Sequence, residues 1–189
     1  DDKVYQTSGG LHGVGLSVVN ALAATLKVEV AREKQLWAQE YARGKPKGKL
    51  KKIKAVNNRR GTTVTFLPDH EVFGAKAVFK ATRLYEMAKA KAYLFRGVEM
   101  RWSCDPQIAI AEDISETETF QFADGILDYL RTMVRERPLV GADIFAGRAD
   151  LNSSNGRIEW AVCWPADAEG FVASYCNTVP TPEGGSHVV

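Results

Sequence analysis

The stretch Ser8–Ala23, SGGLHGVGLSVVNALA, decides how the rest of the chain is interpreted. Its four glycines, at positions 9, 10, 13 and 15, precede apolar residues at helical spacing, namely Val18, Val19, Leu22 and Leu26. Glycine costs about 1 kcal/mol relative to alanine inside a regular element. This density of glycine therefore indicates a backbone that needs positive φ or close approach to a ligand. We predict a loop that leads directly into a helix.

A loop of this kind is a candidate phosphate site, because the first N–H groups of a helix lack intrahelical partners and lie at the positive end of its dipole. The dipole contributes only about 0.3 to 1 kcal/mol, so several N–H bonds must supply most of the affinity. The loop is not a P-loop, because no Gly-Lys-Ser/Thr ends it. Its order, G-x-x-G-x-G, also differs from the dinucleotide fingerprint. Spacing alone leaves a phosphate loop and a tight structural turn both open.

The composition limits the class of protein. A length of 189 residues with 45% hydrophobic content predicts one large or two small domains with a buried core. The net charge of +2 does not by itself indicate nucleic acid. Cys104, Cys163 and Cys176 are odd in number and far apart, which indicates free thiols rather than disulfides or a zinc site.

No apolar stretch is long enough to span a membrane, and the first residues, DDKVYQTSGG, do not resemble a secretion signal. We therefore expect a soluble cytoplasmic protein without a membrane partner. The sequence has no initiator Met and begins a few residues before its glycine loop. This indicates a piece of a longer protein.

Alternating patterns predict strands after the first helix. Residues 26–30 alternate apolar and charged side chains, a polar turn follows at 33–35, and residues 36–41 are the expected antiparallel partner. Residues 61–69, GTTVTFLPD, form a further expected strand with Val64 and Phe66 on one face.

The segment 43–60 between these strands carries nine basic residues and no acidic residue. It fits non-specific phosphate contacts to nucleic acid. A solvated edge that resists aggregation is the favoured interpretation, since no aromatic residue is interleaved to stack on bases. Its basic residues are Arg43, Lys45, Lys47, Lys49, Lys51, Lys52, Lys54, Arg59 and Arg60.

The second half of the chain predicts a helix over 82–95, with Leu84 and Ala92 on its apolar face, and a strand over 98–102. Residues 105–119 are rich in acid and threonine without an apolar period, which favours a domain junction or a solvated loop. Asp124 is the expected cap of a helix that ends before Pro138. Strands are expected at 158–164, after an Asn155-Gly156 hairpin turn, and at 171–179.

The letters GGLHGVGLSVVNAL closely resemble the second glycine box of the gyrase, Hsp90, histidine kinase and MutL (GHKL) ATPase superfamily. A histidine inside the loop and VVNAL after it are typical of the B subunit of the bacterial type IIA DNA topoisomerases. Gly61-Thr62, YLFRGVEMRWSCD and the closing NTVPTPEGGSH resemble further motifs of that family in the same order. One departure is Ser186, where the family usually has threonine.

The resemblance implies an α+β fold, a two-layer α/β sandwich of the GHKL (Bergerat) ATPase type that is truncated at its N-terminus. The start of a ribosomal S5 domain 2-like transducer domain would follow it. We place the ATPase part at residues 1–118 and the transducer part at residues 119–189.

The resemblance also implies an ATP site. The loop residues would surround the phosphates, chiefly through backbone N–H groups, Tyr5 would reach the adenine, and Thr62 would lie on the phosphate side. Ordinary packing remains an alternative for the rings of Tyr5 and His12. The loop residues are Gly10, Leu11, His12, Gly13, Val14, Gly15 and Leu16.

The family's catalytic glutamate, its Mg²⁺-binding asparagine and its adenine-reading aspartate precede Asp1, and its γ-phosphate lysine follows Val189. We therefore assign no catalytic or metal-binding residue. We expect the chain alone neither to bind ATP tightly nor to hydrolyse it.

The implied function is that of an ATP-dependent type II topoisomerase, which relaxes and decatenates DNA and acts in chromosome segregation. The implied cofactors are ATP and Mg²⁺. The implied partners are DNA, the A subunit of the enzyme and a second copy of the B subunit, in a nucleoid-associated A2B2 heterotetramer. Gln6-Thr7, RWSCD and YCNTVPTPEGGSH look more like topoisomerase IV than gyrase.

Three alternatives remain open. The first is a gyrase B subunit that introduces negative supercoils. The second is another GHKL ATPase, of the chaperone or mismatch-repair kind. The third is a non-enzymatic module with a structural glycine loop and a basic segment that binds nucleic acid.

Overall fold

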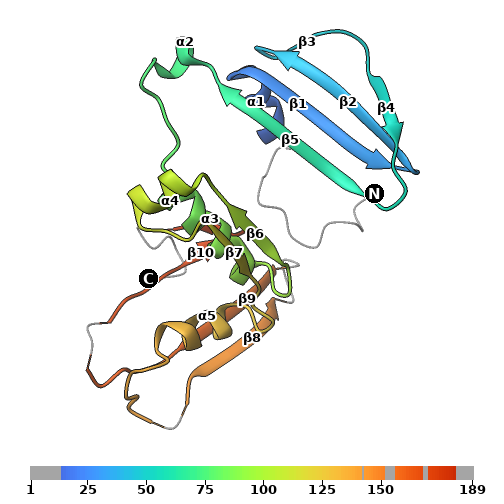
Figure 1. Ribbon diagram of the computed structural model, residues 1–189. Coiled ribbons are helices and arrows are strands. Elements are labelled where there is room, and N and C mark those ends of the chain that lie inside the picture. The colour runs from blue at the N-terminus through green and yellow to red at the C-terminus, as the bar shows by residue number, and fades with distance from the viewer. Residues whose placement is uncertain (1–13, 142, 152–155, 168–169, 182–189) are drawn as a thin grey trace. The chain divides into compact units, whose positions relative to one another are not determined.

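The computed structural model describes residues 14–141, 143–151, 156–167 and 170–181 (Figure 1). The chain divides into two compact units, Asp1–Val78 and Phe79–Val189. The described part of the first unit contains two helices and five strands. They are α1 (Gly15–Ala21), β1 (Ala23–Arg32), β2 (Gln35–Ala42), β3 (Lys45–Pro46), β4 (Lys51–Ala55), β5 (Gly61–Pro68) and α2 (His70–Phe73).

The strands of the first unit form one antiparallel sheet in the order β3-β2-β1-β5, and β4 also pairs with β2. The predicted strands at 26–30, 36–41 and 61–69 are confirmed. β1 and β2 are joined by a two-residue turn in which Glu33 and Lys34 have φ of 53° and 60°. This left-handed pair is the turn geometry that matches the twist of a hairpin.

Pairing across the sheet defines one apolar face. Leu26 lies opposite Phe66, and Val28 lies opposite Val64, so all four side chains point to the same side. This confirms the predicted shared face of Val64 and Phe66. Leu26 is buried, whereas Val64 and Phe66 are 37% and 42% exposed. Burial of this face by the described residues therefore decreases from β1 to β5.

The first helix is shorter than its apolar spacing predicts. α1 ends at Ala21, and the N–H of Leu22 donates to the carbonyl of Val18 (3.0 Å) as the chain turns into β1. Leu26 therefore belongs to the strand, where its alternation with Lys27 prevails over helical spacing. α1 packs against β1 and β2.

The second unit contains three helices and six strands in its described part. They are α3 (Ala81–Leu94), β6 (Met100–Ser103), α4 (Pro106–Glu112), β7 (Thr117–Phe120), α5 (Ile126–Met133), β8 (Phe145–Leu151), β9 (Gly156–Val162), β10 (Tyr175–Cys176) and β11 (Val179–Pro180). β6 pairs with β7, β8 with β9, and β10 with β11, all antiparallel. The predicted helix at 82–95 and strand within 158–164 are confirmed.

An aromatic cluster holds α3, α5 and β10 together in the second unit. The ring of Tyr93 stacks on Tyr129 at 3.9 Å between centroids and meets Phe122 and Tyr175 edge to face. The hydroxyls of Tyr93 and Tyr175 are hydrogen-bonded at 2.6 Å. Tyr93 is buried. On α3, Ala92 is fully buried, whereas Leu84 is 36% exposed.

The structure corrects three expectations in this unit. Residues 105–119 contain α4 and β7 rather than only a loop, and the carboxylate of Asp105 caps α4 by accepting from Gln107 N–H (2.8 Å). The cap residue of α5 is Gly125, not Asp124, whose N–H instead donates to Asp128 (2.7 Å). The expected strand at 171–179 is the tight β10–β11 hairpin, with positive φ at 177 and 178. The domain boundary at 118/119 stays a prediction.

Candidate functional site

The glycine loop of the expected ATP site lies mostly outside the described residues. Its described members are Val14, Gly15 and Leu16, which form the start of α1. The expected site residues outside the described part are Tyr5, Gly10, Leu11, His12 and Gly13.

The start of α1 carries no side-chain cap. Val14 is the cap residue, with φ −94° and ψ −8°, and its carbonyl accepts the N–H of Val18 (3.0 Å). Within the described part of the chain, no carbonyl accepts the N–H groups of residues 14–17. These are the N–H groups that a helix leaves without intrahelical partners. They are the kind of donors that bind an anion.

Among the described residues, the space beside the first turn of α1 is open. A Cβ added at Gly15 would meet no described heavy atom within 4 Å. The side chains of Val14 and Leu16 are 54% and 52% exposed. A ligand group can therefore approach the backbone at Gly15 without displacing any described side chain.

Thr62, the expected phosphate-side threonine, is the second residue of β5. It lies opposite Val30 of β1 and is exposed. Since Val30 alternates in step with Leu26, Thr62 lies on the apolar face of the sheet. α1 packs on β1 and β2, whereas Thr62 lies one strand further across the sheet, on β5. The two parts of the expected site are thus in the same unit but on different elements.

An ion-pair cluster, not foreseen from the sequence, holds the ends of the strands beside α1. Arg43 Nε lies 2.5 Å from Asp69 Oδ2, and its Nη2 lies 2.5 Å from Glu71 Oε1. Backbone bonds from Arg43 N–H to the Ala23 carbonyl (3.1 Å) and from Asp69 N–H to the Leu22 carbonyl (3.0 Å) fix the same corner. Arg43 and Asp69 are 26 positions apart, so neither periodicity nor a local motif predicts the contact.

The carboxylate of Asp69 is buried and held in its charged form. The N–H of Glu71 donates to it (3.0 Å), and this bond is the main cause that lowers the pKa of Asp69 below its usual value. The Arg43 guanidinium lowers the pKa further, against the opposing effect of burial. The cluster therefore stabilises the corner where α1 enters the sheet.

The described residues show no group of three or more His, Cys, Asp or Glu side chains that would hold a metal ion. In the same residues, no helix is long and apolar enough to cross a membrane. The three cysteines are free thiols.

Comparison with known sequences gives relatives along the whole chain. It is 48% identical over 188 residues to the B subunit of DNA topoisomerase 4 from Bartonella bacilliformis, covering 99% of this chain and 27% of the relative. It is 47% identical over 189 residues to the same protein of Caulobacter vibrioides, again covering 27% of the relative. Residues 125–189 match the family model described as DNA gyrase B. The chain thus spans just over a quarter of the curated relatives.

Solved structures with the same fold are ATPase domains of gyrase and topoisomerase IV. The 43K ATPase domain of Thermus thermophilus gyrase B, in complex with an aminocoumarin, has a TM-score of 0.71 at 24% identity, over 89% of this chain and 44% of that one. The topoisomerase IV ATP-binding domain of Francisella tularensis, in complex with a small-molecule inhibitor, has a TM-score of 0.67 at 26% identity, over 93% and 45%.

The fold, together with the glycine-rich sequence that precedes α1, defines the class, the GHKL-type ATPase domain. Within that class, the chain belongs to the B-subunit family of the bacterial type IIA DNA topoisomerases. This confirms the family that the glycine box and the later motifs predicted.

Proposed function

We propose that this chain is the nucleotide-responsive part of a type IIA DNA topoisomerase B subunit, and that the whole protein couples ATP binding and hydrolysis to DNA strand passage. The curated relatives are named as B subunits of DNA topoisomerase 4, which favours topoisomerase IV over gyrase. The proposed outcome is relaxation and decatenation of DNA. The proposed partners are DNA, the A subunit of the enzyme and a second copy of the B subunit.

The start of α1 is the observation that carries this proposal. N–H groups that no described carbonyl accepts, and space at Gly15 that no described side chain fills, give a backbone surface that suits phosphate oxygens. A nucleoside triphosphate fits such a surface because its phosphate oxygens accept several hydrogen bonds from N–H groups at once. We propose that the phosphates contact Gly10, Leu11, His12, Gly13, Val14, Gly15 and Leu16, with Thr62 beside them and Tyr5 at the adenine.

ATP, with its Mg²⁺, would supply binding energy that differs between the open and closed forms of the B-subunit pair. A ligand shifts such an equilibrium only by its differential affinity for the two forms. A shift from 1:99 to 99:1 requires about 10⁴-fold tighter binding to the closed form, or roughly 5.5 kcal/mol. The residues of this chain would contribute by binding and orienting the phosphates at the start of α1.

The second unit is proposed to include the start of a transducer domain, from residue 119 onward. The match of residues 125–189 to the DNA gyrase B model supports a separate module in this region. β7, which spans the proposed boundary, pairs with β6. A transducer that begins near residue 119 would thus be joined to the ATPase part through a shared pair of strands.

The test replaces Gly15 in the full-length protein by Val and measures the affinity for a non-hydrolysable ATP analogue by titration calorimetry. We expect Gly15→Val to weaken binding tenfold or more, because each factor of ten corresponds to about 1.4 kcal/mol of lost contacts. The melting temperature without nucleotide should change little, since no described atom would clash.

The matched control is Gly170→Val, which places the same side chain at another open position without a left-handed φ. It should leave the affinity unchanged. Equal affinity of wild-type and Gly15→Val protein would contradict the proposed site.

A further inference from the structure

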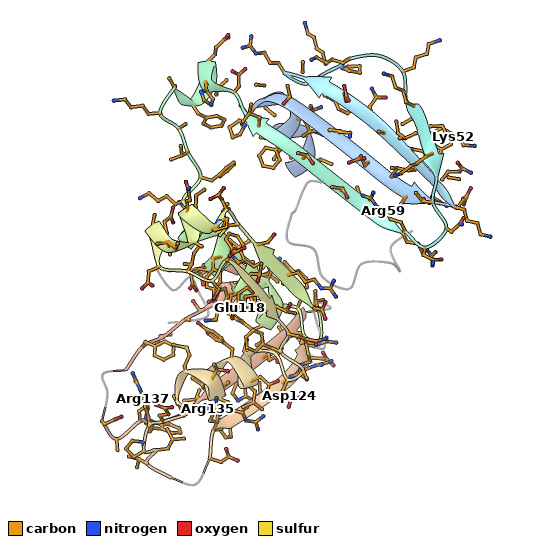
Figure 2. The ribbon with its side chains drawn as sticks, in the orientation of Figure 1. Lys52, Arg59, Glu118, Asp124, Arg135 and Arg137 are labelled. Carbon is orange, nitrogen blue, oxygen red and sulfur yellow. The ribbon has the colours of Figure 1, made fainter. Side chains whose placement is uncertain are left out.

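The outer edge of the sheet in the first unit carries an unusual surplus of positive charge. β3 and β4 both pair with β2, on the side away from β1 and β5, and they belong to the basic segment 43–60. Figure 2 shows Lys52 on β4 and Arg59 on the connection that leads to β5. The segment contains nine cations and no acid.

Most of these cations have no acidic partner. Arg43 is bound to Asp69 and Glu71, and Arg59 donates to the hydroxyl of Thr63 (3.1 Å). This leaves seven of the nine, six lysines and Arg60. All seven are exposed, and none forms an ion pair with any described residue. The positive charges of such neighbouring side chains repel one another unless an anionic partner or salt neutralises them.

Three of the lysines converge on one hollow. Lys47, Lys49 and Lys51, together with Lys27 of β1, line a depression of about 140 Å³ that also includes Glu40. Four lysines and one glutamate are thus among the residues that line the hollow. Lys27 also forms an ion pair with Glu29 (3.4 Å).

The loop that carries these lysines is fastened to the sheet. Lys47 N–H donates to the Glu40 carbonyl (2.8 Å), and Gln39 Nε2 donates to the Gly48 carbonyl (2.9 Å). Lys51 lies opposite Ala38 in the β2–β4 pair, so it faces the same side as Lys27. Lys27 and Lys51 therefore lie together on the face opposite to Leu26 and Thr62, and the fastened loop carries Lys47 and Lys49 beside them.

The residue types of this basic surface fit duplex DNA better than single-stranded DNA. No aromatic residue lies in 43–60 to stack on bases, as binding of single strands usually requires. The cations of the hollow are all lysines, which act as point charges on phosphate rather than as bidentate readers of a base. Protection of an edge strand from aggregation explains one or two lysines, but it does not explain their convergence on a shared hollow.

We propose that this lysine surface, defined by Lys27, Lys47, Lys49 and Lys51, binds the phosphate backbone of duplex DNA without sequence preference. The inference rests on the proposed function, since it is the strand-passage role that brings duplex DNA to this protein. Lys27 and Lys51 of this surface lie on the face of the sheet opposite to Thr62.

The test uses the full-length protein with Lys47→Gln, Lys49→Gln and Lys51→Gln combined. Its affinity for a fluorescent duplex of about 30 bp is measured by anisotropy between roughly 50 and 200 mM salt. Each phosphate contact contributes about 0.9 to the slope of log K against log salt. If all three lysines contact phosphate, the slope should fall by about 2.7, equally for duplexes of unrelated sequence.

The control combines Lys76→Gln, Lys80→Gln and Arg83→Gln, which removes the same charge from exposed positions outside the lysine surface. It should change the slope by much less. An unchanged slope in the lysine variant, or an equal fall in the control, would overturn the proposal. So would normal DNA binding with increased aggregation, which would assign the lysines to edge protection.

The nucleotide response separates this inference from the proposed function. If the lysine variant keeps both its DNA affinity and its ATP-dependent dimerisation, the lysine surface alone is wrong. If the wild-type protein shows no nucleotide response at all, the proposed function is wrong, and the salt slope still reports whether the lysines bind DNA.

Discussion

The hydrogen bond between the hydroxyls of Tyr93 and Tyr175 links α3 to β10, and its removal gives a sharp test of the packing in the second unit. Tyr93 is 5% exposed, and the two oxygens lie 2.6 Å apart. A typical hydrogen bond of this kind contributes a net of roughly 0.5–1.5 kcal/mol. Either Tyr93→Phe or Tyr175→Phe should therefore cost about 1 kcal/mol, because each leaves the other hydroxyl without its partner.

The double variant shows whether the two hydroxyls stabilise the protein through one shared bond or through separate contributions. Once one hydroxyl is gone, removal of the second costs little, so the double variant should also lose about 1 kcal/mol rather than roughly 2, a coupling energy of about 1 kcal/mol. Hydrogen–deuterium exchange of peptides from α3 and α5 in the full-length protein measures the loss of stability of the second unit in each variant. A loss of about 1 kcal/mol corresponds to about fivefold faster exchange.

The control is Tyr41→Phe on β2, which removes a tyrosine hydroxyl in the first unit and should leave exchange in α3 and α5 unchanged. About fivefold faster exchange in each single variant and also in the double variant supports a direct bond between the two hydroxyls. A double variant that exchanges about 25-fold faster would refute it, because the two hydroxyls would then act independently.

Three further outcomes are expected. Gly147→Ala should destabilise the protein by about 1–3 kcal/mol in urea unfolding, since its Cβ would lie 2.2 Å from the Trp160 ring, whereas Gly170→Ala should be neutral. The lowered pKa of Asp69 contributes stability that is present above about pH 4 and is lost as the pH falls further, so Asp69→Asn should flatten the acid limb of a stability-against-pH curve. Burial and the Tyr175 hydroxyl raise the pKa of Tyr93 above its usual value, so stability should fall as the pH rises beyond about 10, and less so in Tyr93→Phe, when followed by calorimetry.

The sequence predicts the sheet of the first unit well because its evidence is local. Alternation over 26–30 and 36–41, separated by a short polar turn, specifies a hairpin regardless of what packs on it. The β-branched strand that begins at Gly61 follows the same rule. The identity of the glycine box adds the family, which spacing alone leaves open.

The expectations that failed depend on features that periodicity does not report. α4 is short, and only the Asp105-Pro106 pair, a cap followed by proline in the first turn, indicates it. The apolar residues 171–179 look like one strand, but left-handed φ at Asn177 and Thr178 turns the chain back into the β10–β11 hairpin. Composition does not reveal such a turn when no glycine occupies it.

The candidate site is predictable only in part for a similar reason. The start of α1 follows from the glycine loop, and Thr62 follows from the family resemblance. The Arg43–Asp69 ion pair and the hollow lined by lysines depend on which strands are neighbours. That information resides in the sheet order and not in any segment of the sequence.

Analytical ultracentrifugation of the full-length protein, with and without a non-hydrolysable ATP analogue, tests whether nucleotide bound at the start of α1 drives dimerisation. The analogue should convert wild-type protein to dimers. Gly15→Val protein should stay monomeric with its DNA affinity intact. Dimers of the Gly15→Val variant at the same analogue concentration, or a wild-type protein that ignores the analogue, would contradict the claim that the start of α1 binds the nucleotide phosphates.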